Sequence, residues 1–157
     1  IYKDKKPYMG VVYNPILDEL YYAKVNEGAF LNDKKIEVAN NDDLMTSLIS
    51  TGFPYSSATN QDDLNDVITK IKNILPVCQD IRRLGSAALD LCYVSRGIYG
   101  GYYEMNLKAW DVSAGIIILN EAGGKVTNLN NETYTLFEDK YIVASNKAIH
   151  GALLKQL

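Results

Sequence analysis

The stretch Trp110–Gly115 contains one carboxylate, Asp111, at the point where a helix of small and apolar residues is predicted to begin. Asp is favoured at helix starts because its side chain accepts hydrogen bonds from free backbone N–H groups. The same oxygens can instead hold a divalent cation near the helix terminus. Magnesium requires hard oxygen ligands in near-octahedral geometry, so one carboxylate by itself makes a weak site. The Trp110 ring is expected to pack beside Asp111 and fix its position.

Two other segments carry groups that could bind a substrate. Small side chains at Gly85, Ser86 and Ala87 leave the N–H groups of a helix start open to a hydroxyl or an anion. Close packing of a helix on a strand explains the same small residues equally well. Glu104 ends a predicted strand seven positions before Asp111. Its carboxylate could accept hydrogen bonds from substrate hydroxyls, or it could be a solvated surface group.

The remaining titratable residues suggest less chemistry. Two acidic pairs, Asp42–Asp43 and Asp62–Asp63, lie in polar loops, and we interpret them as helix starts or solvated turns. The single histidine, His150, gives little support for Ser-His-Asp or Cys-His catalysis. Cys78 and Cys92 form no CxxC pair, so we expect buried free thiols rather than a zinc or redox site.

Composition excludes several classes of protein. Hydrophobic residues make up 47% and charged residues 22% of the 157 residues, which is typical of a soluble globular protein. The net charge of −3, with no Lys/Arg-rich stripe, gives no electrostatic support for binding nucleic acid. The longest strongly apolar run, Ile116–Leu119, is far shorter than the ~20 residues that span a bilayer. Because no secretory signal is visible either, the cytoplasm is the expected compartment.

The elements that position these residues follow two patterns. Residues up to Val38 read as an antiparallel meander with turns over 4–7, 14–18 and 28–36. After the polar stretch Asn40–Asp43, short strands alternate with helices, the pattern of an α/β layer. We predict helices over residues 64–75, 86–95, 111–122 and 147–157, and strands over 19–25, 36–38, 48–52, 81–84, 99–104, 142–144 and at Val126.

The run Tyr102–Asp111, followed by the apolar helix and Glu121–Gly124, resembles the C-terminal signature of inositol monophosphatase-like enzymes. The earlier segments Gly10–Pro15 and Gly28–Asn32 are similar to the same family, so the resemblance extends to the C-terminal helix. The family's Asp-Pro-(Ile/Leu)-Asp-Gly-Thr motif and its earlier Glu pair, which hold most of the metal, do not occur here. Together with the non-methionine Ile1, this predicts that the sequence continues a longer chain.

The resemblance implies a fold and a division into domains. The fold would be α/β: the C-terminal α/β layer of the inositol monophosphatase-like sugar phosphatase fold, with remnant antiparallel strands. Residues 1–46 would be the antiparallel remnant of the N-terminal α+β domain, and residues 47–157 the C-terminal α/β domain. The antiparallel strands would expose edges that pair with another segment. Family members are often homodimers, so a homodimer is a possible assembly.

The resemblance also assigns roles to the candidate residues. Asp111 becomes a catalytic Mg²⁺ ligand, and Glu104 accepts hydrogen bonds from substrate hydroxyls. Gly85–Ala87 corresponds to a Gly-Thr-Ala segment that contacts the sugar or inositol ring, with Ser86 retaining the hydroxyl. Lys108 stands where the best-known animal enzymes have a histidine, and its ammonium could favour an additional anionic group on the substrate.

These roles describe a magnesium-dependent phosphomonoesterase that hydrolyses inositol monophosphate or a related polyol or sugar phosphate. Two Mg²⁺ ions would share the work, one activating water and the other, held partly by Asp111, offsetting charge on the leaving oxygen. The alternatives are a sugar bisphosphatase, a nucleotide 3′-phosphatase or NADP phosphatase, and a non-catalytic binding or assembly module. Because Asp111 is the one expected metal ligand present, the 157-residue chain alone is expected to be inactive.

Overall fold

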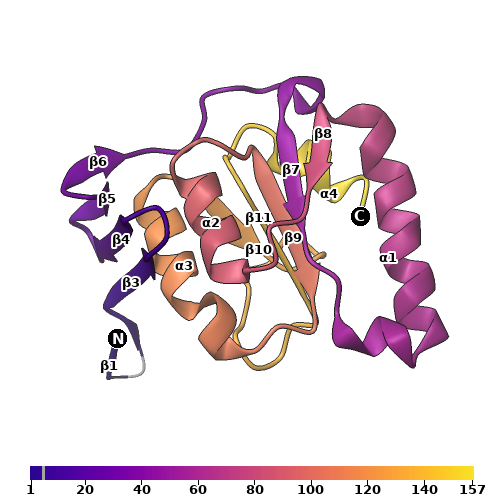
Figure 1. Cartoon of the computed structure of the whole chain (residues 1–157), viewed down its shortest axis with the longest axis horizontal. Coiled ribbons are helices and arrows are strands. Elements are labelled where there is room, and N and C mark those ends of the chain that lie inside the picture. Colours follow the sequence, from indigo (N-terminus) through magenta and orange to yellow (C-terminus); the bar gives the residue numbers. More distant parts are fainter. Residues whose placement is uncertain (5) are drawn as a thin grey trace.

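The computed structural model describes residues 1–4 and 6–157, which form two larger β-sheets and a short two-stranded ribbon, with helices between and beside the larger sheets (Figure 1). The described helices are α1 (Gln61–Ile74), α2 (Ala87–Ser95), α3 (Ala109–Glu121) and α4 (His150–Leu154), together with the 3₁₀ turns η1 (Leu44–Thr46), η2 (Tyr55–Ala58) and η3 (Leu75–Val77). Within these residues, no helix combines the length and apolar character needed to cross a membrane.

The first sheet is an antiparallel meander in the order β3-β4-β5-β6. The turn between β5 and β6 has positive φ at both Asn32 (47°) and Asp33 (64°), as a two-residue hairpin turn requires. A two-stranded ribbon of β1 and β2 precedes this sheet, and the predicted turn over 4–7 includes residue 5, which lies outside the described residues. The strands are β1 (Tyr2–Lys3), β2 (Lys6–Pro7), β3 (Met9–Asn14), β4 (Glu19–Lys24), β5 (Gly28–Leu31) and β6 (Lys34–Ile36).

The second sheet is mixed, with the strand order β10-β11-β9-β7-β8. Strand β7 lies between β8 and β9 and runs parallel to both, whereas β11 is antiparallel to β9 and β10. Its strands are β7 (Leu48–Thr51), β8 (Asp80–Arg82), β9 (Gly101–Met105), β10 (Lys125–Thr127) and β11 (Tyr141–Ser145). The antiparallel start and the later α/β layer are therefore both present, as the sequence pattern predicted.

The layers are held by two hydrophobic cores on opposite faces of the mixed sheet. Neighbouring residues of a strand point to opposite faces, so Tyr102 joins the core with α2 and α3 while Tyr103 joins the core with α1 and α4. Helix α3 lies between the two sheets (Figure 1). A Cβ on Gly10 would meet the Ala114 carbonyl oxygen at 2.4 Å, and one on Gly115 would meet Leu91 at 2.7 Å. These glycines therefore let α3 approach β3 and α2 closely.

Most predicted elements are present, but several of their bounds differ, with strands predicted over 81–84 and 99–104 lying at Asp80–Arg82 and Gly101–Met105. Helix α3 begins at Ala109, two residues before the predicted start. The last helix covers only His150–Leu154, because Gln156 and Leu157 donate to carbonyls three residues back and so form turns. Most of the turn predicted over 28–36 is strands β5 and β6, since the chain reverses only at residues 32–33, and the strand predicted over 36–38 ends at Ile36. Both cysteines are free and buried, as predicted.

Candidate functional site

The candidate residues follow the three parallel strands β7, β8 and β9. Parallel strands end at the same edge of a sheet, and ligands of α/β proteins bind beyond those carboxyl ends. The segment Gly52–Ser56 follows β7, Arg83–Ala87 follows β8, and Asn106–Asp111 follows β9. Sheet topology therefore brings three segments that are distant in sequence to one place.

Two adjoining pockets lie at this edge, and Asp111 lines both of them. The first, of about 470 Å³, is lined by Pro54, Tyr55, Ser56, Glu104, Met105, Asn106, Leu107, Lys108, Trp110 and Asp111. The second, of about 350 Å³, is lined by Tyr55, Gly85, Ser86, Ala87, Ala88, Leu107, Trp110 and Asp111. The structure thus places all six residues that the sequence nominated around two pockets with a shared wall.

Asp111 is the third residue of α3. Its Oδ2 accepts the backbone N–H of Lys108 at 2.8 Å, so the carboxylate satisfies the amide that precedes the helix. Within the described residues, Oδ1 accepts no hydrogen bond and remains available to a ligand. The Trp110 prediction was wrong: its ring is 79% exposed and lies at the rim of both pockets, because residue 110 is in the first helical turn, outside the packed part of α3.

The start of α2 forms the wall of the second pocket. Gly85 has φ +89°, a conformation that favours glycine, and this turns the chain from β8 into the helix. Ser86 is the residue before the helix, and its Oγ accepts the N–H of Leu89 at 3.5 Å. Among the described residues, the N–H groups of Ala87 and Ala88 have no acceptor. The two free donors and the positive end of the helix dipole suit an oxygen atom of a ligand.

Glu104 points from β9 toward Gly52 at the end of β7. A Cβ on residue 52 would lie 2.1 Å from the Glu104 carboxylate, so only glycine leaves room for it. Tyr102 Oη donates to Glu104 Oε2 at 2.6 Å, and burial raises the pKa of this carboxyl above its usual range. The nearby Arg83 guanidinium opposes that shift. Glu104 is therefore partly desolvated, with Oε1 free of hydrogen bonds among the described residues.

A second carboxyl, Asp90, lies deeper on α2, where it is only 1% exposed. Burial raises its pKa to about 7, and the negative charge of Glu104 adds to the shift. Asp90 Oδ1 and the buried Ser50 Oγ both lack a hydrogen-bond partner. No sequence pattern marks either residue, because a single acidic residue in a helix carries no spacing signal.

The metal predicted at Asp111 can be tested against its surroundings. No group of three or more His, Cys, Asp or Glu side chains that could hold a metal ion occurs within residues 1–4 and 6–157. Asp111 nevertheless offers one free carboxylate oxygen to two pockets, which suits a hard cation that takes few protein ligands. These residues fit a magnesium ion as a partial ligand set. Lys108, exposed at the helix start, adds a positive group to the first pocket.

Asp63, which the sequence suggested to be a helix start or a solvated turn, instead connects the site loops. It is 6% exposed and pairs with Lys140 Nζ at 2.9 Å. Ser56 Oγ donates to Asp63 Oδ2 at 2.5 Å, and Asn106 Nδ2 donates to Ser56 Oγ at 3.1 Å. These bonds lower the pKa of Asp63, with Ser56 as the largest cause. The loops after β7 and β9 are thereby joined at the pocket.

The other acidic residues have the structural roles that the sequence suggested. Asp43 caps η1 by accepting the N–H of Met45 at 2.9 Å. Asp62 lies in the first turn of α1, although the residue that caps this helix is Asn60. Asp42 is exposed. Tyr55 was not predicted to belong to the site. The signal that could have indicated it is its position directly after a Gly-Phe-Pro segment that follows a buried strand.

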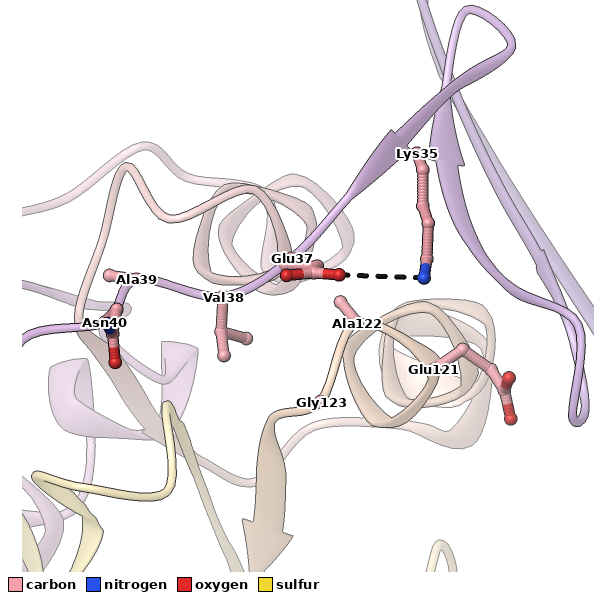
Figure 2. A pocket seen from close by; sticks show the side chains of 8 residues that line it. All are labelled: Lys35, Glu37, Val38, Ala39, Asn40, Glu121, Ala122 and Gly123. Carbon is pink, nitrogen blue, oxygen red and sulfur yellow. Dashed lines mark ion pairs between the residues drawn. The ribbon is translucent and has the colours of Figure 1, made fainter.

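A third pocket, of about 430 Å³, lies at the other end of α3 (Figure 2). Lys35 Nζ and Glu37 Oε1 form an ion pair of 3.6 Å there, while Glu121 extends away from Glu37. The Glu121 carboxylate instead accepts the N–H groups of Asn26 and Gly28, each at 3.0 Å. A helix C-terminus carries a partial negative charge. A phosphate is therefore better accommodated at the Asp111 end, which lies roughly 15 Å away at 1.5 Å per residue.

Residues 1–157 match the inositol monophosphatase family, and the chain belongs to this family. A solved structure of inositol monophosphatase from Anabaena (Nostoc) sp. PCC 7120 is 37% identical, with a TM-score of 0.89 over 95% of this chain and 57% of that one. The fold is therefore the α/β fold of inositol monophosphatases.

Curated relatives carry several names. Inositol-1-monophosphatase of Mesorhizobium japonicum is 38% identical over 93% of this chain and 53% of its own length. Nus factor SuhB of Pasteurella multocida is 40% identical over 94% of this chain and 54% of its own length. The Aquifex aeolicus protein named fructose-1,6-bisphosphatase/inositol-1-monophosphatase is 37% identical over 98% of this chain and 55% of its own length. The chain thus spans about half the length of the curated relatives it matches.

Proposed function

We propose that the whole protein containing this chain is a magnesium-dependent phosphomonoesterase acting on inositol monophosphate or a related polyol or sugar phosphate. The observation that carries the proposal is the meeting of Asp111, Glu104 and the free N–H groups of α2 at two adjoining pockets. A carboxylate with a free oxygen, a hydroxyl acceptor and an oxygen-binding helix start are the groups that a phosphate ester of a polyol requires. Membership of a phosphatase family supports the same reaction.

Each residue contributes a distinct step. Asp111 would hold Mg²⁺ through its free Oδ1 while Oδ2 keeps the Lys108 N–H. Bound Mg²⁺ supplies the chemistry that the side chains lack, namely activation of water and neutralisation of charge on the leaving oxygen. Glu104 would accept hydrogen bonds from the hydroxyl groups of the alcohol, and the N–H groups of Ala87 and Ala88 would hold an ester oxygen against the α2 dipole. Together they orient the ester for in-line attack.

The alcohol part of the substrate distinguishes the proposed monophosphatase from related phosphatases. A sugar bisphosphatase would use the same metal centre, and the positive charge of Lys108 beside the first pocket favours a substrate with a second phosphate. The name of the Aquifex aeolicus relative includes such an activity for that protein. A panel of phosphate monoesters and bisphosphates, assayed with the whole protein, distinguishes the two by their kcat/KM values. A non-catalytic module would hydrolyse none of them.

The metal requirement gives the most direct test. Turnover of inositol 1-phosphate by the whole protein should require added Mg²⁺, cease on chelation and return when Mg²⁺ is restored. The 157-residue chain alone should show no appreciable turnover, because Asp111 is its one expected metal ligand and one carboxylate makes a weak site. Turnover by this chain at about 1 s⁻¹ or faster, an ordinary enzyme rate, would contradict our assignment of the ligands.

A further inference from the structure

A network of four polar side chains lies against the first pocket, and the proposed reaction does not use it. It joins Ser56 in η2, Asp63 in α1, Asn106 in the turn after β9 and Lys140 just before β11. We call these residues the Asn106 network. Lys140 Nζ, Ser56 Oγ and Asn106 Nδ2 all donate to the Asp63 carboxylate. Ser56 and Asn106 also line the pocket, so the network forms part of its wall.

Asn106 is held through both its backbone and its side chain. Its N–H donates to the Lys140 carbonyl oxygen at 2.8 Å, and its Nδ2 donates to Ser56 Oγ at 3.1 Å and to Asp63 Oδ2 at 3.3 Å. Lys140 Nζ donates in turn to Asp63 Oδ1 at 2.9 Å, so these contacts form a closed ring. Because a largely exposed ion pair adds little stability by itself, the main consequence of the ring is that the turn is fixed from two sides.

The backbone conformation of Asn106 is one that glycine adopts with less strain. Its φ is +62°, in the left-handed region. Asn106 is also exposed, so burial of its side chain does not offset that strain. A glycine at this position would keep the turn and lose both side-chain hydrogen bonds. The amide group, rather than the backbone conformation, is therefore what distinguishes asparagine from glycine here.

The turn that contains Asn106 connects the two carboxylates of the site. Glu104 is two residues before it, and Lys108, two residues after it, donates its N–H to Asp111 Oδ2 at 2.8 Å. The direction of the Asp111 carboxylate therefore depends on the position of the Lys108 backbone, which depends on the turn. Displacement of a catalytic group by about 1 Å can lower a rate about 10²-fold, so movement of this turn would matter for turnover.

We propose that Asn106, anchored by Asp63 and Lys140, is a positioning residue that keeps the Asp111 carboxylate directed at the pockets before a cation or a substrate binds. The proposal rests on the phosphatase function proposed above and adds to it a residue that acts through Asp111. A group that is already in place when its ligand arrives does not have to be ordered by binding. Loss of the Asn106 amide should therefore weaken cation binding more than binding of the ester, which α2 and Glu104 also hold.

The test is Asn106→Gly in the whole protein, since glycine retains the positive φ. We expect kcat for inositol 1-phosphate to fall about tenfold, the effect of a displacement somewhat below 1 Å. The Mg²⁺ concentration that gives half-maximal turnover should rise by a similar factor, whereas KM at saturating Mg²⁺ should stay within about twofold. Asp63→Ala should act in the same direction. The double variant should be little worse than the worse single variant, because residues of one network are not additive.

Amide hydrogen exchange, followed by mass spectrometry, gives a readout that does not require turnover. The whole protein is measured without Mg²⁺ and without substrate. In Asn106→Gly, exchange should become faster in peptides that span residues 106–111, because the turn is no longer tied to Asp63. Peptides that span α2 should exchange as they do in the unmodified protein.

Asn131→Gly is the matched control. Asn131 has a φ of +64°, is exposed, accepts a hydrogen bond from Lys125 Nζ at 2.8 Å and lines neither pocket at Asp111. This variant should leave turnover and exchange over residues 106–111 unchanged. An Asn106→Gly variant that changes only the melting temperature, or that lowers kcat without faster exchange over residues 106–111, would overturn the proposal.

Failure of the proposed function would be recognised separately. If the unmodified whole protein shows no Mg²⁺-dependent turnover of phosphate esters, the phosphatase function fails. The exchange comparison still supports or contradicts the role of Asn106 in holding the turn, because it needs neither the metal nor a substrate.

Discussion

Two buried polar clusters of this chain differ in how well their side chains are satisfied. We call Ser50, Asp90, Tyr102 and Glu104 the site cluster, because it lies between α2 and the strand ends beneath the pockets. In this cluster Asp90 Oδ1 and Ser50 Oγ have no hydrogen-bond partner. Its side chains share one hydrogen bond, which Tyr102 Oη donates to Glu104 Oε2. The site cluster therefore buries more polar atoms than it pairs.

The other group, which we call the closed cluster, consists of Thr127, Ser145 and His150. Ser145 Oγ lies 2.7 Å from Nδ1 of His150, and Thr127 Oγ1 lies 2.9 Å from Nε2, so both ring nitrogens have partners. His150 is 2% exposed, and burial lowers its pKa to about 4. His150 is therefore neutral at pH 7 and hydrogen-bonded through both ring nitrogens.

The contrast between the two clusters shows where unpaired buried polar atoms lower the stability of the fold. An unpaired buried polar group costs about 1–3 kcal/mol, and natural proteins keep few of them. Here the unpaired atoms Asp90 Oδ1 and Ser50 Oγ lie under the candidate site, and Ser57 Oγ and Tyr103 Oη are unpaired elsewhere, whereas the equally buried closed cluster has none. Locally unfavourable interactions in a folded protein are commonly found at its functional sites. We therefore expect changes at the site end to affect turnover or to relieve instability, and changes in the closed cluster to affect stability alone.

The largest effect should come from Asp111→Asn in the whole protein. An Asn oxygen can still accept the Lys108 N–H, so the melting temperature should stay nearly unchanged. The lost negative charge should lower kcat about 10²–10³-fold, since a metal ion supplies several kcal/mol of transition-state stabilisation and about 1.4 kcal/mol is tenfold. Melting and turnover are measured side by side. A variant that melts earlier yet retains turnover would reduce Asp111 to a helix-start residue.

Asp90→Asn should produce the largest change in stability. Because burial raises the Asp90 pKa from 3.8 to about 7, the folded state retains a proton that the unfolded chain releases as the pH rises. Stability should therefore fall between about pH 4 and pH 7, by roughly 4 kcal/mol at 1.4 kcal/mol per pKa unit. Asn cannot ionise, so the variant should lack this loss and be more stable than the parent at pH 8.

Urea unfolding at pH 4.5, 6 and 8 measures the Asp90 effect. Equal pH dependence in the parent chain and in Asp90→Asn would show that Asp90 is ionised at little cost, and the contrast between the clusters would then lose its main support. A matched control is Asp42→Asn, since Asp42 is exposed and should leave the pH dependence as it is.

The closed cluster should respond to pH in the opposite direction. The His150 pKa is lowered from 6.5 to about 4, so the unfolded chain binds a proton before the folded chain does. Stability should fall as the pH drops from about 6.5 to 4, by roughly 3 kcal/mol. His150→Phe removes the titration and should flatten this acidic limb, at a cost of about 1–3 kcal/mol at neutral pH for the lost hydrogen bonds. If the variant instead lowered turnover at unchanged stability, His150 would belong to the site.

Local sequence patterns predicted some features of the fold and the site, and not others. Local patterns sufficed for the helices: apolar spacing and Ser86 predicted α2, and the Asp111 run predicted α3 to within two residues. They also sufficed to nominate Asp111, Glu104 and Gly85–Ala87. The family resemblance, rather than periodicity, assigned their roles, and those roles remain predictions until the variants are measured.

The remaining features depend on contacts between distant residues. Glu104 is half-buried because β7 lies beside β9 and places Gly52 against its carboxylate, a pairing that no local pattern specifies. Asp63 pairs with Lys140, which is 77 positions later in the chain. Trp110 was expected to pack, as large rings usually do, yet the first turn of α3 projects into the pocket rather than the core. Sheet order therefore decides which polar residues share a site.

The smallest expected effect belongs to Glu104, and it tests whether the site cluster recognises the alcohol. Glu104→Gln in the whole protein keeps the size of the side chain and one acceptor oxygen but removes the charge. A polyol phosphate presents ring hydroxyls to this group, whereas a small aryl phosphate presents none. We therefore expect hydrolysis of the polyol ester to be impaired more, by about 1–3 kcal/mol, the scale of hydrogen bonds to charged groups.

The measured quantity for Glu104 is the ratio of kcat/KM for the two esters before and after substitution, which separates alcohol recognition from the shared phosphate and metal chemistry. Because Glu104 is not expected to hold the cation, the concentration of Mg²⁺ that gives half-maximal turnover should barely change. The loss of a buried charge should also make the variant slightly more stable, since burial raises the pKa of this carboxyl and so disfavours its ionised form. An unchanged ratio with increased stability would make Glu104 a buried carboxylate without a substrate role, and would leave Gly85–Ala87 to contact the alcohol.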